Sequence, residues 1–95
     1  MTGTTRSSAG LDERRRRLLY RSWHRGMREM DLVMGRFADA AIADLSDAEL
    51  ATFEQLSDLP DPDLYAWICG DRPVPAAVDT PLFRKLRAFH LGEGR

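Results

Sequence analysis

Apolar residues recur at steps of three and four along most of this chain, which is the spacing of an α-helix that buries one face. The longest run predicts a helix over residues 27–45, with apolar positions at Met30, Val33, Met34, Phe37, Ala38, Ala41, Ile42 and Leu45. An earlier run predicts a helix over residues 11–24, whose inward face holds Leu11, Leu18, Leu19, Ser22 and Trp23. Gly26 lies between the two runs and ends or bends the first helix.

Gly35 lies inside the longest predicted helix. Glycine in a helix interior costs about 1 kcal/mol relative to alanine. We therefore expect this position to allow a neighbouring group to pack closely.

Capping signals define two further helices. Ser46 and Glu49 have the spacing of a capping box, so a short third helix should bury Leu50, Phe53, Leu56 and Leu59. Asp61 followed by Pro62 has the pattern of a helix cap with proline at the first helical position. The fourth helix should then bury Leu64, Tyr65, Ile68 and Cys69, and Gly70 should end it.

Pro73 and Pro75 predict a loop over residues 71–79, because proline cannot continue a helix. Thr80 and Pro81 then open a fifth helix that turns Leu82, Phe83, Leu86 and Phe89 inward. No segment alternates with the period of two that a strand requires. The sequence therefore predicts an all-α, single-domain, small five-helix bundle over residues 11–91. Flexible tails are expected over residues 1–10 and 92–95.

Composition agrees with one small intracellular domain. The chain has 95 residues, 43% of them apolar, which suffices for one core. Its single cysteine excludes an internal disulfide, and no Cys/His cluster has the spacing of a zinc site. No apolar run approaches the ~20 residues of a membrane span, so we expect no membrane insertion. Thirteen arginines against one lysine favour a bacterial source, and we expect a cytoplasmic protein.

Charge is distributed unevenly along the chain. Residues 1–28 contain eight arginines, whereas residues 39–71 contain nine acidic residues and no lysine or arginine. The two regions either neutralise each other within the fold or form a bipolar surface that docks on a partner.

The segment from Arg25 to Asp31 concentrates charge at the corner between the first two predicted helices. Charged side chains there have little structural work, so they are candidates for contact with a partner. The alternative is a set of internal ion pairs, Arg25 with Glu29 and Arg28 with Asp31, at helical spacing. The residues alone leave these two interpretations about equal.

Other chemically active residues favour ordinary structural roles. His24 is more typical of a helix end than of a proton carrier, and Cys69 more typical of a small apolar residue than of a reactive thiol. The run from Arg14 to Arg17 resembles a nucleic-acid patch, but four successive arginines cannot share one helix face. We predict no catalytic residue, no cofactor site and no metal site, and we expect no nucleic acid to bind.

Three segments resemble the succinate dehydrogenase flavinylation factor family. Arg25-Gly26-Met27-Arg28-Glu29, followed by Met30-Asp31, is similar to the family's Arg-Gly-x-x-Glu motif. Residues 44–49 resemble its Leu-Ser-x-x-Glu segment, and residues 60–68 its Asp-Pro-Asp-Leu-aromatic-x-Trp-Leu stretch. The matches occur in the family's order and spacing, within a region from about residue 14 to residue 90. His24 departs from the pattern, because many bacterial members have a basic residue there.

The resemblance implies a five-helix bundle that acts as an assembly factor rather than as an enzyme. Family members promote covalent attachment of FAD to a histidine of the flavoprotein subunit of succinate dehydrogenase, and in some bacteria of fumarate reductase. On this basis the partner carries the FAD, this chain binds no cofactor stably, and it is a monomer before binding. The expected partner-binding residues are Arg25, Gly26, Met27, Arg28, Glu29 and Asp31. The alternative is a nucleic-acid or antitoxin-like regulatory module that uses the face of Arg14 to Arg17.

Overall fold

A computed structural model describes residues 10–92 of the chain as five α-helices and one short 3-10 helix. The elements are α1 (Glu13–Trp23), α2 (Arg28–Ala41), η1 (Ile42–Asp44), α3 (Asp47–Ser57), α4 (Asp61–Cys69) and α5 (Pro81–His90). The prediction of a small all-α, five-helix domain is confirmed. The second predicted helix is divided, because α2 ends at Ala41 and the chain continues as η1. Most of both predicted tails, residues 1–9 and 93–95, lies outside the described residues.

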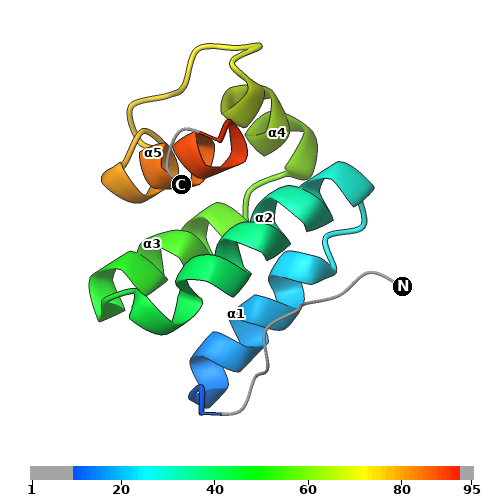
Figure 1. Cartoon of the computed structure of the whole chain (residues 1–95). Helices are drawn as coiled ribbons and strands as arrows, with labels where there is room; N and C mark the ends of the chain where they lie inside the picture. Colours follow the sequence, from blue (N-terminus) through cyan, green and yellow to red (C-terminus); the bar gives the residue numbers. More distant parts are fainter. Residues whose placement is uncertain (1–9, 93–95) are drawn as a thin grey trace.

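The helix α2 occupies the centre of the arrangement (Figure 1). It packs against α1 on one side and against α5 on another, while α3 contacts both α1 and α5. The helix α4 packs on α5. The corner between α1 and α2 therefore belongs to the central helix, whose position is fixed from several sides.

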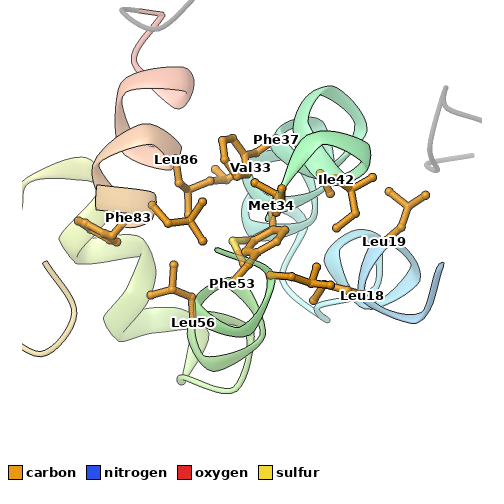
Figure 2. Packing of buried hydrophobic residues seen from close by; sticks show 14 of the residues in the cluster. Leu18, Leu19, Val33, Met34, Phe37, Ile42, Phe53, Leu56, Phe83 and Leu86 are labelled. Carbon is orange, nitrogen blue, oxygen red and sulfur yellow. The ribbon is translucent and has the colours of Figure 1, made fainter. Parts of the chain in front are cut away.

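The core forms where the inward faces of these helices meet (Figure 2). Met34 of α2, Phe53 of α3 and Leu86 of α5 are fully buried there. Phe37 meets Phe53 edge to face, with ring centroids 5.5 Å apart. Most predicted inward residues are buried, although Ala41, Leu59 and Phe89 are half-buried, and so are Tyr65 and Cys69 of α4. The side of α4 that carries them is therefore more open than its sequence predicts.

The capping signals position the helices largely as predicted. Ser46 and Glu49 form both hydrogen bonds of the capping box. Hydrogen bonds from the Ser46 backbone and from Lys85 hold the pKa of Glu49 below its usual 4.5. Gly70 ends α4 with a left-handed φ of 83°. The prediction for Asp61 is wrong, because Pro60 is the N-cap of α4 and Asp61 is its first residue, with its carboxylate directed to another segment.

Gly35 provides the close approach predicted for it. A Cβ atom at this position would overlap the Trp23 indole ring, so the ring rests directly on the backbone of α2. The indole N–H donates to the carboxylate of Asp39 at 3.1 Å. This contact holds the last residue of α1 against α2, just before the corner begins.

We expect Gly35→Ala to destabilise the fold, although alanine favours helix by about 1 kcal/mol. The new methyl group must displace the Trp23 ring, at a typical cost of about 1–3 kcal/mol for overpacking. Urea denaturation measures the difference. Combining Gly35→Ala with Trp23→Phe, which removes the larger ring, should cost less than the sum of the single changes. A gain in stability from Gly35→Ala alone would contradict this packing.

Candidate functional site

The corner between α1 and α2 is a short turn with one obligatory glycine. His24 ends α1, and Met27 in an extended conformation begins α2. Between them Gly26 has a φ of 90°, a backbone conformation that other residues adopt only with strain. An added Cβ at Gly26 would meet no heavy atom within 4 Å. Gly26 thus shapes the turn while leaving open space on its outer side.

Arg25 turns its side chain inward, although it lies in the corner. The side chain is only 8% exposed, and the carboxylate of Asp61 accepts from its Nε at 2.9 Å and from its Nη2 at 2.6 Å. The backbone carbonyl and hydroxyl oxygens of Ser57 accept from Nη1, and the carbonyl of Leu59 accepts from Nη2 at 3.3 Å. Because all five guanidinium N–H donors have acceptors, Arg25 ties the corner to the connection between α3 and α4.

Asp31 closes the same corner from the side of α2. Its carboxylate accepts from the backbone N–H of Arg25, and the residue is half-buried. The expectation of an exposed charged corner is therefore wrong for the Arg25 guanidinium, which Asp61 and the carbonyls around it draw into the fold. The side chains of Arg25 and Asp31 hold the corner in place.

Arg28 and Glu29 remain outside these contacts. The internal pairs offered by helical spacing, Arg25 with Glu29 and Arg28 with Asp31, do not form, because Arg25 pairs with Asp61 instead. Both Arg28 and Glu29 are exposed, and neither side chain has a hydrogen bond or ion pair with any residue that the structure describes. The corner consequently presents an exposed glycine, an unpaired cation and an unpaired anion, beside a half-buried Met27.

A groove of about 680 Å³ begins beside Glu29. It runs along α2 and is bounded by α4 and α5, with lining residues Glu29, Leu32, Val33, Arg36, Asp39, Ala40, Tyr65, Phe89 and His90. Hydrogen bonding with the Cys69 thiol, and further the negative charge of Glu29, raise the pKa of the Tyr65 hydroxyl above its usual value of 10.0. No local pattern in the sequence predicts this groove, because its walls come from segments far apart in the chain.

The arginine run of α1 is largely engaged within the fold. Arg14 binds Glu54 of α3 through two hydrogen bonds of 2.9 and 2.7 Å, which hold the pKa of that carboxyl below its usual value. Arg15 donates to the backbone carbonyls of Ile42 and Leu45, at the two ends of η1. These contacts support the interpretation that the basic and acidic regions neutralise each other.

The remaining arginines of α1 extend this pattern. Arg17 pairs with Glu13, and Arg21 pairs with Asp58 at the end of α3. Within the run, Arg16 alone has no ion pair among the residues described. This use of the arginines argues against the nucleic-acid alternative, since that alternative requires a free basic face.

His24 and Cys69 occupy ordinary structural positions. The His24 ring stacks on the exposed ring of Tyr20 with centroids 3.9 Å apart, and its Nδ1 lies 2.7 Å from the Tyr20 carbonyl oxygen. Cys69 forms no disulfide and is half-buried. Over residues 10–92 no group of three or more His, Cys, Asp and Glu side chains could hold a metal ion. In the same range no helix is both long enough and apolar enough to cross a membrane.

These features define a small all-α protein with a braced, charged corner. A family model described as flavinator of succinate dehydrogenase matches residues 16–90, and the chain belongs to this family. It is 38% identical over 76 residues to the "FAD assembly factor SdhE" of Acetobacter pasteurianus, which covers 80% of this chain and 70% of the relative.

Mitochondrial relatives show the same similarity. The chain is 36% identical over 74 residues to "Succinate dehydrogenase assembly factor 2, mitochondrial" of Dictyostelium discoideum, covering 78% of this chain and 52% of the relative. The protein of the same name from Meyerozyma guilliermondii is 42% identical over 78 residues, covering 82% and 54% of the two chains. The chain thus spans about half the length of these mitochondrial relatives. No solved structure matches it significantly.

We expect Asp61→Ala to destabilise the protein strongly, because it leaves the buried guanidinium of Arg25 without its counter-ion. Removing one partner of a buried pair typically costs about 3–5 kcal/mol. Asp63→Ala is the matched control, since Asp63 lies in the same helix turn as Asp61 and pairs with Arg72, with side chains 43% and 50% exposed. That exposed pair should contribute about 0–1 kcal/mol. Equal loss in the two variants, measured by urea denaturation, would contradict the bracing role of Arg25.

Proposed function

We propose that this protein is an assembly factor that binds the flavoprotein subunit of succinate dehydrogenase and promotes covalent attachment of FAD to a histidine of that subunit. Family membership and the names of the relatives support a role in the flavin assembly of succinate dehydrogenase. The observation that supports the binding site is the corner itself, where Arg28 and Glu29 are exposed beside Gly26 and have no ion pair within residues 10–92. The family resemblance implies fumarate reductase as a second client.

In this proposal the motif residues divide into two groups. Gly26, Met27, Arg28 and Glu29 form the contact surface, and we name them the docking corner. The open side of Gly26 lets a partner backbone approach closely, while Glu29 and Arg28 offer an acceptor and a donor of opposite charge.

Arg25 and Asp31 act behind the docking corner as positioning residues. Their hydrogen bonds fix the backbone of the turn before any partner arrives. A preformed contact surface binds more tightly, because less conformational freedom is lost on association. The monomeric bundle would thus meet the flavoprotein in a one-to-one complex.

The chemistry belongs to the partner in this mechanism. The histidine nucleophile and the FAD are both carried by the flavoprotein, and the assembly factor contributes orientation. Holding two reacting groups in a productive geometry raises their effective concentration by several orders of magnitude. The assembly factor therefore needs neither a catalytic residue nor a cofactor site of its own.

We expect Glu29→Ala to lower covalent flavin on the subunit at least about tenfold, because it removes a central contact without touching the core. The flavoprotein is expressed in cells lacking this protein, which is then restored as wild type or variant. In-gel flavin fluorescence of the denatured subunit measures attachment. Asp44→Ala removes another exposed carboxylate that has no ion pair among the described residues, and it should leave the signal unchanged. Full flavin fluorescence with a folded Glu29→Ala protein would contradict the assignment of the docking corner as the contact surface.

Two substitutions of Gly26 distinguish the effect of backbone strain from the effect of lost partner contact. Gly26→Ala and Gly26→Arg both place a side chain at a φ of 90°, with a similar strain of about 1–2 kcal/mol. Because nothing in the fold lies near the new Cβ, the two variants should unfold at similar urea concentrations. Binding of the flavoprotein, measured by calorimetry, should fall much further for Gly26→Arg. Equal binding by both variants would show that no partner approaches Gly26.

A further inference from the structure

The groove beside the docking corner follows one stripe of α2. Glu29, Leu32, Arg36 and Ala40 line it at helical steps of three and four, and Phe89 of α5 forms part of the facing wall. Glu29 belongs both to the docking corner and to the rim of this groove. A partner that covers the corner therefore also reaches the mouth of the groove.

The groove has a defined charge pattern. Glu29 and Arg36 are seven residues apart, which places them about 10 Å apart along the helix axis. Leu32 is half-buried between them, and Tyr65 and Phe89 add aromatic surface. The side chains of Glu29 and Arg36 make no hydrogen bond or ion pair with another residue in the described part of the chain, although those of most arginines of α1 do. The groove is thus apolar in the middle, and among the described residues Glu29 and Arg36 are its charges without an ion pair. The carboxylate of Asp39, which also lines the groove, accepts a hydrogen bond from the Trp23 indole.

We propose that this groove binds a segment of the flavoprotein subunit that carries an apolar side chain between a cation and an anion. The cation meets Glu29, the anion meets Arg36, and the apolar side chain packs among Leu32, Tyr65 and Phe89. This inference rests on the proposed function and extends its interface from the docking corner along α2. The matched charges would set the direction in which the segment lies.

The shape of the groove favours such a segment over a second copy of this chain. Two copies facing each other across the same surface would each present a hollow, and neither hollow would fill the other. A segment that projects from a different protein can enter the hollow and bury its apolar floor. Continuity with the docking corner identifies the flavoprotein as that protein.

Two variants test the groove without touching the docking corner. Arg36→Glu reverses the charge that should meet the anion, and Ala40→Trp fills the far end of the groove from an exposed position. Arg16→Glu makes the same charge change on the exposed surface of α1, and Ala48→Trp adds the same ring to the exposed surface of α3. Calorimetry measures Kd for the purified flavoprotein subunit that contains non-covalent FAD. Urea denaturation of each variant confirms its fold.

We expect Arg36→Glu and Ala40→Trp each to raise Kd at least about tenfold, and both controls to stay within about twofold of wild type. Wild-type affinity in the two groove variants, with weakened binding by Glu29→Ala, would overturn the groove alone and leave the proposed function intact. Equal weakening by Arg16→Glu would also overturn it, since net charge would then explain the effect. The groove proposal would also be overturned if the wild-type protein sedimented as a dimer and Ala40→Trp dissociated that dimer. A wild-type protein that does not bind the flavoprotein would overturn the groove and the proposed function together.

Discussion

The inward-facing guanidinium of Arg25 is the interaction on which the rest of the structure depends. It joins the turn between α1 and α2 to residues 57–61, and Asp61 balances its charge in a site where both side chains are nearly excluded from water. A buried ion pair contributes little net stability compared with apolar packing, but breaking it is costly. Its main effect is therefore geometric, because it fixes where Gly26 and the first turn of α2 lie.

That constraint explains how one short motif can be both structural and functional. The carboxylates of Asp61 and Asp31 take up the donors of Arg25, so Glu29 and Arg28 lose the partners that helical spacing would give them. Elsewhere on the surface, ion pairs join α1 to α3 and α3 to α5 and leave few charges of the basic run unpaired. Among the described residues, Arg28, Glu29 and Arg36 of α2 have no ion pair, and they lie at the corner and in the groove beside it.

Much of the fold follows from local signals in the sequence. The capping box at Ser46, the left-handed Gly70 and the small Gly35 each have a local physical cause, so their roles were predictable. The role of Asp61 was not predictable in this way. Its position after Pro60 suggests a helix cap, whereas its carboxylate binds Arg25, 36 positions away. The groove lay beyond prediction for the same reason, since it needs the relative placement of three helices. Resemblance to the family identified the motif, but it could not show that Arg25 faces inward.

Amide hydrogen–deuterium exchange of this protein, with and without the flavoprotein subunit, tests the central claim most directly. Residues 26–32 should exchange more slowly in the complex, because the partner covers Gly26 and the first turn of α2. Residues 13–18 should show no change, because the arginines of α1 serve the fold rather than the partner. Protection confined to α1, with none over residues 26–32, would contradict the assignment of the docking corner.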